Sequence, residues 1–427
     1  MNKTRILSSI DVGSSKVAVL IGQQSEASGK INILGASSLP SVGIRKSQIV
    51  NIEEASDCII KTVEAAERMA GLAVGKILVS VGGTHISSQN SHGVVAVANP
   101  EGEIVSDDVR RAIEAARAIS LPSSREILHV IPRTFTVDSQ QGVADPIGMS
   151  GVRLEVETHI ITGSTTALKN LSKCVAEIGA DIGDLVFSGI ASATAVLTET
   201  EKELGVVLLD IGGGTTSLVI FLENAPCYSA VLPVGAKNVT NDLAIGLRLS
   251  LDGAEKLKIA LSEKKEEIMK KDEKGAADEI DLAQLGIFEE TKQVSRKTLV
   301  EGIIKPRLNE IFSLVAAEIQ KSGFAGLTPS GVVLTGGGAL TQGAVEACRR
   351  NLSLPVRIGI PNGVSGLVDD ILNPAFAASI GLLQYGFKGG EERSERIFLP
   401  KFGDFSQKIP IKGLFGKISS FIKSFLP

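Results

Sequence analysis

The fold is decided by LDIGGGTTSLVI at residues 209–220, where an apolar strand ends in an aspartate and a glycine-rich turn before a second strand. A shorter version of this pattern, IDVGSSKV, occupies residues 10–17. Glycine lets the backbone turn tightly and direct N–H groups at an anion with no side chain in between. One such turn is common, but two of them predict a pair of phosphate-binding loops on two similar lobes.

Both turns carry the residue types that a bound triphosphate needs. Each aspartate ends its strand at a point where it would hold a hydrated Mg²⁺, since this ion keeps several waters and takes few carboxylates. We therefore expect the metal-side carboxylates to be Asp11 and Asp210. Together with Asp11, the candidates for phosphate binding are Gly13, Ser14, Ser15, Lys16, Gly212, Gly213, Gly214, Thr215 and Thr216.

A third glycine cluster, VVLTGGGA at residues 332–339, also follows an apolar strand. Its glycines Gly336, Gly337 and Gly338 would let an adenosine lie against the backbone. In DGAEKLK, Glu255 and Lys258 are three residues apart on one helical face, a spacing that suits ribose hydroxyls. Neither a Walker nor a Rossmann pattern follows any strand. Three clusters in this order predict a nucleotide cleft of another type.

Composition excludes several classes of protein. The chain has 427 residues, of which 43% are hydrophobic and 22% charged, so we expect several globular domains. Its net charge of -4, with no basic domain, argues against a nucleic-acid partner. The four cysteines are scattered, which predicts a reduced cytoplasmic compartment and no metal cluster. The sequence shows neither a signal peptide nor a membrane span.

The last residues form a distinct segment, IKGLFGKISSFIKSFL at 411–426, behind a stretch at 387–410 that reads as a flexible linker. Its apolar residues recur at helical spacing between lysines, a pattern typical of a helix lying on an anionic bilayer. Packing on the protein body or docking on another protein stays open. The candidates for membrane contact are Ile411, Leu414, Phe415, Lys417, Ile418, Phe421, Ile422, Lys423, Phe425 and Leu426.

One such helix would bind membrane reversibly, whereas many on a polymer would bind far better through effective concentration. The anchor itself therefore favours a self-assembling protein.

Several stretches together resemble the actin-like ATPase superfamily and, within it, the FtsA family of bacterial cell-division proteins. The resemblance implies an α/β fold: an actin-like (ribonuclease H-like) two-lobed ATPase with an α+β insert and a C-terminal amphipathic helix. Besides the two aspartate turns and the terminal segment, it is carried by FSGIASATAVLTETEKELG (187–205), PVGAKNVTNDLAIGL (233–247), AEKLK (254–258), LTGGGAL (334–340) and NPAFAASIGLL (373–383).

The expected domains follow from this resemblance and from changes in composition and apolar pattern along the chain. They are lobe 1 at residues 1–83 and 161–204, an inserted α+β subdomain at 84–160, lobe 2 at 205–240 and 300–386, a small subdomain of lobe 2 at 241–299, the linker at 387–410 and the membrane-binding helix at 411–427.

The resemblance also implies a function. The protein would bind ATP with Mg²⁺, polymerise, and tether the ring of the division GTPase FtsZ to the cytoplasmic face of the cell membrane at the division site. The insert at 84–160 would recruit other division proteins, and the small subdomain of lobe 2 would meet the tail of FtsZ. The alternatives are a small-molecule kinase with the same cleft, and another actin-like filament or pilus-assembly protein.

Two departures from the family pattern matter. Hydrolases of the superfamily carry a Gln or Glu that orients water, where the matching stretch here is Gly189-Ile190. General-base help, about 10²–10⁴-fold, would then be missing, so we expect slow or absent ATP hydrolysis and assign no catalytic residue. The second departure is Lys237, which stands where a glycine is common.

Overall fold

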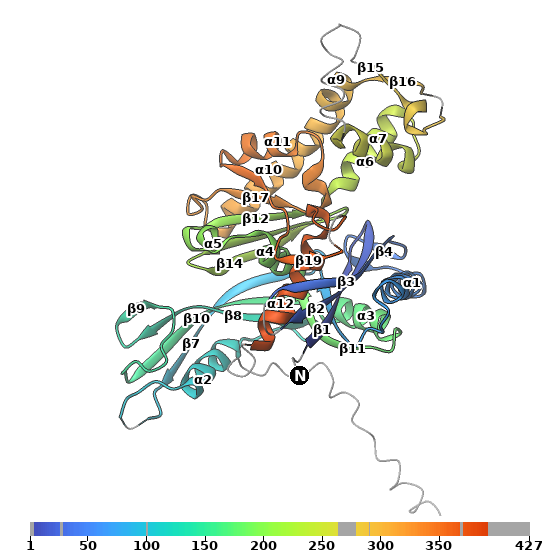
Figure 1. Cartoon of the computed structure of the whole chain (residues 1–427). Coiled ribbons are helices and arrows are strands. Elements are labelled where there is room, and N and C mark those ends of the chain that lie inside the picture. Colours follow the sequence, from blue (N-terminus) through green and yellow to red (C-terminus); the bar gives the residue numbers. More distant parts are fainter. Residues whose placement is uncertain are drawn as a thin grey trace, which may run out of the picture.

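The computed structural model describes residues 4–25, 29–99, 101–263, 279–289, 291–367 and 370–391. Two lobes stack one above the other, with the insert projecting to one side of lobe 1 (Figure 1). The terminal segment at 411–427, and the linker from residue 392 on, lie outside the described residues. Residues 387–391, expected to belong to the linker, are instead part of the last helix, which continues to Glu391 and in which Phe387 is buried.

Lobe 1 is built on a six-stranded sheet of order β11-β6-β1-β2-β3-β19. Strands β1 to β3 form an antiparallel meander, and β6 and β11 continue it in parallel from β1. The strands are β1 (Thr4–Val12), β2 (Lys16–Ser25), β3 (Ile31–Pro40), β6 (Lys76–Val81), β11 (Asp181–Phe187) and β19 (Val364–Gly366).

Lobe 2 repeats this plan in a five-stranded sheet of order β14-β13-β12-β17-β18. The meander β12 to β14 is again antiparallel, and β17 joins β12 in parallel. The two similar lobes predicted from the repeated turn are therefore confirmed at the level of sheet topology. The strands are β12 (Val206–Ile211), β13 (Thr216–Leu222), β14 (Ala225–Leu232), β17 (Val332–Thr335) and β18 (Val356–Ile358).

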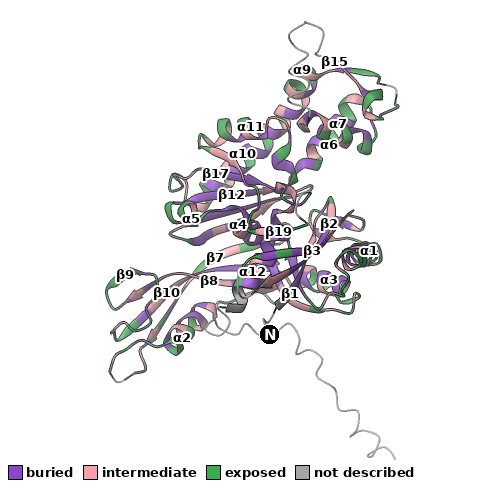
Figure 2. Cartoon of the chain, in the orientation of Figure 1, coloured by how far each residue is buried: buried purple, intermediate pink, exposed green. Residues whose placement is uncertain are grey.

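Helices bury the apolar faces of both sheets (Figures 1 and 2). In lobe 1, α1 lies along β2 and β3, and α12 lies along β1, β2 and β6. The helices of lobe 1 are α1 (Ile52–Ala70), α3 (Thr165–Ala176), α4 (Ser188–Val196) and α12 (Ala377–Glu391). Those of lobe 2 are α5 (Glu199–Leu204), α10 (Lys305–Ser322) and α11 (Ala344–Leu352). The expected bounds of the lobes are therefore wrong in three places. Strand β19 and helix α12 were expected in lobe 2 but belong to lobe 1, because β19 pairs with β3 and α12 packs on β1, β2 and β6. Helix α5 was expected in lobe 1 but packs on β13 of lobe 2.

A small subdomain extends lobe 2 at the end far from the insert (Figure 1). Its helices α6 and α7 pack on each other, and a two-stranded sheet lies beside them. The elements are α6 (Ala236–Leu247), α7 (Leu251–Glu263), β15 (Glu279–Asp281), β16 (Gln293–Ser295) and α9 (Arg296–Leu299).

The insert has a four-stranded sheet of order β7-β10-β8-β9 and a hydrophobic core of its own. Helix α2 packs so closely on β7 that a Cβ at Gly93 would collide with the carbonyl of Ala112. The elements are β7 (Ser87–Ala96), α2 (Ser106–Arg117), β8 (Arg125–Val137), β9 (Gln140–Val143) and β10 (Arg153–Ser164).

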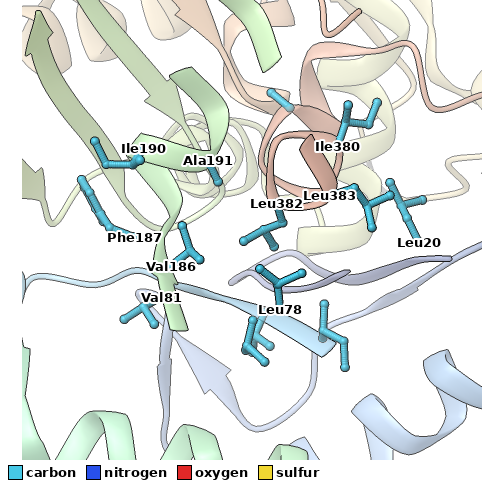
Figure 3. Packing of buried hydrophobic residues seen from close by; sticks show 14 of the residues in the cluster. Leu20, Leu78, Val81, Val186, Phe187, Ile190, Ala191, Ile380, Leu382 and Leu383 are labelled. Carbon is cyan, nitrogen blue, oxygen red and sulfur yellow. The ribbon is translucent and has the colours of Figure 1, made fainter. Parts of the chain in front are cut away.

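Helices α4 and α12 pack together on the inner strands of lobe 1 (Figure 3). Leu382 and Leu383 of α12 lie near Leu78 and Leu20 of the sheet, and all except Leu78 are fully buried. Gly381 faces the carbonyl of Ala191, where a Cβ would not fit. Within the described ranges, no helix is both long enough and apolar enough to traverse a bilayer.

Candidate functional site

A cleft of about 670 Å³ lies between the two lobes, within the size range of small-ligand sites. Of the residues predicted from sequence, Gly214 and Thr216 do not line it. Thr216 is buried and donates its hydroxyl to the Val234 carbonyl, and Gly214 packs against Ser14. The predicted residues that do line the cleft are Asp11, Gly13, Ser14, Ser15, Lys16, Asp210, Gly212, Gly213, Thr215, Glu255, Lys258, Gly336, Gly337 and Gly338.

The first phosphate loop, residues 13–15, turns tightly between β1 and β2. The Gly13 N–H donates to the Lys16 carbonyl at 3.1 Å, and a Cβ at Gly13 would stand 2.9 Å from that oxygen. Ser41 holds the loop from outside, because its hydroxyl donates to the Gly13 carbonyl (2.6 Å) and its N–H to the Ser15 carbonyl (3.0 Å). These contacts occupy carbonyl oxygens that would otherwise repel an anion.

The second phosphate loop, residues 212–215, is held by the start of α6. The Ala236 N–H donates to the Gly212 carbonyl (2.9 Å) and the Lys237 N–H to the Gly213 carbonyl (2.8 Å). A Cβ at Gly235 would stand 2.5 Å from the Gly212 oxygen, so only glycine fits there. The N-terminus of α6 thus lies beside the loop and adds its positive dipole end to the site.

The two aspartates lie half-buried at the base of the loops, and each accepts one serine hydroxyl. Ser80 donates to Asp11 Oδ1 and Ser192 to Asp210 Oδ2, both at 2.6 Å. Burial raises the pKa of Asp11, although Ser80 and Lys16 oppose the rise. Burial raises the pKa of Asp210 to about 6; Ser192 opposes the rise, and the charge of Asp11 adds to it.

These donors fit Mg²⁺. Two half-buried carboxylates that repel each other are stabilised by a divalent cation between or near them. Among the described residues, no group of three or more His, Cys, Asp or Glu side chains forms a protein-only cage. A pair of carboxylates completed by waters and phosphate oxygens is how Mg²⁺ is usually held.

Lys16 places a cation at the same end of the cleft. Its ammonium lies 3.0 Å from the ring centroid of Phe376, a cation–π contact. Burial lowers the pKa of Lys16 to about 8, with Asp11 opposing the shift. Lys16 is therefore charged at neutral pH and available to a phosphate.

The predicted nucleoside residues also line the cleft. Lys258 is buried and donates to Glu255 Oε2 (2.7 Å) and to Thr240 Oγ1 (2.9 Å), which fixes both side chains at the wall of the cleft. Gly336 has a φ of +80°, and a Cβ there would stand 2.6 Å from the Ile211 carbonyl. The glycine cluster consequently offers bare backbone to a ligand.

Sequence reasoning missed several serines that line the cleft. The first residue of α4, Ser188, lines it beside Ser217, with 3.3 Å between their hydroxyl oxygens. The expected stretch Gly189-Ile190 is buried and does not line the cleft. Ser80 is the last residue but one of β6, which pairs in parallel with β1, so its position near Asp11 could have been predicted from that pairing. Ser47, at the tip of the hairpin β4 (Ile44–Arg45)–β5 (Gln48–Ile49), carried no such signal.

Comparison with known proteins identifies the family. Residues 83–162 match a model described as "SHS2 domain inserted in FTSA", and residues 207–381 match one described as "Cell division protein FtsA". Cell division protein FtsA of Pseudomonas aeruginosa is 39% identical over 90% of both chains. The Escherichia coli K12 protein is 32% identical over 95% of this chain and 96% of its own length.

Solved structures agree on the fold. The PilM–PilN type IV pilus biogenesis complex superimposes with a TM-score of 0.62, at 16% identity over 89% of this chain and 98% of the other. MreB5 of Spiroplasma citri bound to ADP gives 0.52, at 14% identity over 92% and 99%. The expected actin-like architecture with its insert is confirmed, and the chain belongs to the FtsA family of cell-division proteins.

Proposed function

We propose that this protein is an ATP-dependent, polymerising adaptor that tethers the FtsZ ring to the cytoplasmic face of the cell membrane at the division site. The observation that carries the proposal is the cleft, in which one glycine-rich loop from each lobe faces the other above two half-buried carboxylates of raised pKa. The chain belongs to a family of cell-division proteins, which supports a role in cell division. The MreB5 structures with ADP and with AMPPNP support a nucleotide as the ligand.

Different residues of the cleft would bind different parts of the nucleotide. The N–H groups of residues 13–15 and 212–215, with Lys16, would bind phosphate oxygens. Asp11 and Asp210 would hold Mg²⁺ through waters, and the ion would neutralise the phosphate charge. Glu255 and Lys258 would bind the ribose, and Gly336–Gly338 would face the base.

Nucleotide would act as a switching ligand with slow or absent turnover. The carboxylates lining the described part of the cleft are Asp11, Asp210 and Glu255, and the first two are committed to the metal. Ser188 and Ser217 can orient a water, but a neutral serine hydroxyl is a poor general base. A small-molecule kinase would need a general base to deprotonate the substrate that accepts the phosphoryl group. The described residues of the cleft therefore give this alternative no support. Turnover near the enzyme median of about 10 s⁻¹ would refute slow hydrolysis.

The membrane anchor is the amphipathic segment 411–427. Eight large apolar side chains on one face, with lysines beside them, suit an anionic bilayer. Polymerisation would raise the binding of this weak anchor through avidity. FtsZ and other division proteins, the latter through residues 84–160, are the proposed partners.

Co-sedimentation with anionic vesicles tests the proposal, using the full chain and a chain lacking residues 411–427, with and without Mg-ATP and FtsZ. We expect the full chain to bind vesicles, to bind more strongly with ATP, and to bring FtsZ down with it. The truncated chain should stay in the supernatant. Vesicle binding that survives the truncation would refute the anchor, and failure to recruit FtsZ would refute the adaptor role.

A further inference from the structure

Lys237, in the first turn of α6, contacts both phosphate loops at once. Its backbone N–H donates to the Gly213 carbonyl of the second loop at 2.8 Å. Its side-chain ammonium crosses to lobe 1 and donates to the Ser14 carbonyl of the first loop at 2.7 Å. A single residue of lobe 2 therefore holds one carbonyl oxygen of each loop.

This double contact completes a pattern in the first loop. A phosphate loop binds an anion with its N–H groups, so its carbonyl oxygens must be bound elsewhere. Ser41, within lobe 1, binds the carbonyls of Gly13 and Ser15. The carbonyl between them, that of Ser14, is bound by Lys237 from the opposite lobe. The first loop thus depends on lobe 2 for one of its three carbonyl contacts.

The position of Lys237 is electrostatically unfavourable for a lysine side chain. A cation in the first turn of a helix faces the positive end of the helix dipole. The side chain also has to reach across the lobe junction, where its partner is a neutral carbonyl. Lys237 is exposed and is not among the described residues that line the cleft.

A second contact joins the same two loops. The Ser47 N–H donates to Ser14 Oγ (2.7 Å), and Ser47 Oγ is 3.1 Å from Thr215 Oγ1. Lys46 and Ser47 both have positive φ angles of 46° and 56°, which non-glycine residues rarely adopt. The junction between the loops is therefore built from both sides, by a hairpin of lobe 1 and by Lys237 of lobe 2.

We propose that Lys237 is a positioning residue that couples the two phosphate loops. Its ammonium holds the Ser14 carbonyl away from the cleft, so the first loop has its anion-binding form only when lobe 2 is closed against it. The inference rests on the proposed nucleotide site. The affinity for the phosphates therefore depends on whether the lobes are closed, whereas the affinity for the nucleoside does not.

The test compares Lys237→Met, which removes the charge and keeps the length, with Lys237→Arg, which keeps the charge. Lys61→Met, an exposed lysine on α1, is the control for net charge. Isothermal titration calorimetry on the full chain measures the affinities for Mg-ATP, Mg-ADP and adenosine. We expect Lys237→Met to weaken ATP and ADP about tenfold, equivalent to about 1.4 kcal/mol, and to leave adenosine within about twofold. Lys237→Arg and Lys61→Met should bind like the parent chain.

Hydrogen exchange on the ligand-free full chain supplies a second readout. We expect Lys237→Met to speed exchange of the amides at residues 13–16, which lie in the other lobe, with exchange in the insert unchanged. Weaker ATP binding without faster exchange there would mean a direct phosphate contact and would overturn the positioning role. So would an equal loss of adenosine affinity, or exchange and ATP binding both unchanged. If the parent chain binds no ATP, the proposed nucleotide site fails, while the exchange result still decides the coupling.

Discussion

Replacing Asp210 by Asn should make the protein more stable and at the same time unable to bind Mg-ATP tightly. The Asp210 carboxyl is half-buried at the base of the cleft, and its pKa rises from 3.8 to about 6, chiefly because burial disfavours the charge and also because Asp11 is nearby. A difference of about 2 units corresponds to roughly 3 kcal/mol. This value is the upper limit of the decrease in the free energy of unfolding that the ionised Asp210 carboxylate causes in the ligand-free protein at neutral pH. The amide oxygen of Asn can still accept the Ser192 hydroxyl.

The sign of the pH dependence follows from the raised pKa. Between pH 3.8 and about 6 the folded protein holds a proton that the unfolded chain has lost, so stability falls as pH rises through this window. Above about pH 6 the folded protein has also released this proton, and Asp210 causes no further fall in stability. Asp210→Asn imitates the protonated carboxyl, so its advantage should be largest at pH 7.5 and should vanish near pH 4.

Differential scanning calorimetry without Mg²⁺ or nucleotide is the suitable assay, since the chain has no Trp to report unfolding by fluorescence. At roughly 1 °C per kcal/mol for a chain of 427 residues, a gain of about 1–3 kcal/mol is a rise in Tm of about 1–3 °C at pH 7.5. Asp57→Asn, an exposed aspartate on α1, controls for net charge and should not change the Tm. A variant that is no more stable than the parent at pH 7.5, or equally stabilised at pH 4, would refute the reasoning.

Three further outcomes are expected. Gly381→Ala puts a methyl group against the Ala191 carbonyl between α12 and α4, and overpacking of this kind should cost about 1–3 kcal/mol, seen as a lower Tm; an unchanged Tm would show that the helices separate freely. Gly235→Ala crowds the carbonyls of residues 212 and 213, so calorimetric titration should show ATP affinity reduced and adenosine affinity retained; equal losses for both would contradict this. Burial lowers the pKa of Lys16 to about 8, so ATP affinity should fall from pH 7 to pH 9 as the ammonium is lost; Lys16→Arg should abolish the trend, and a trend that persists in it would assign the titration to another group.

The residues of the two phosphate loops could be predicted from the sequence because their chemistry is local. A strand, an aspartate and a glycine turn act within about eight residues, so the pattern is visible without any tertiary contact. The same holds for Glu255 and Lys258, which one helical turn brings onto the same face. Gly214 and Thr216, which were also predicted to bind phosphate, do not line the cleft, because the pattern cannot tell which side of a turn faces it.

The partners of those residues come from distant parts of the chain. Ser80 reaches Asp11 because β6 lies beside β1, and Ser192 reaches Asp210 because α4 passes between the lobes. Lys237 was visible only as an unusual residue, since its contact with Ser14 exists only once lobe 2 stands against lobe 1. Similarly, Ser188 and not Gly189-Ile190 lines the cleft, a distinction set by the rotation of one helix.

By itself, the sequence determined the two glycine-rich turns, the repeated lobe and the position of the insert, because backbone geometry and apolar periodicity act over short spans of chain. Only the tertiary structure decided the acidity of Asp210 and the linkage between the loops. Both depend on burial and on groups from separate strands and helices meeting within about 3 Å, at hydrogen-bonding distance. That proximity is a property of the packed lobes, and no short stretch of residues contains it.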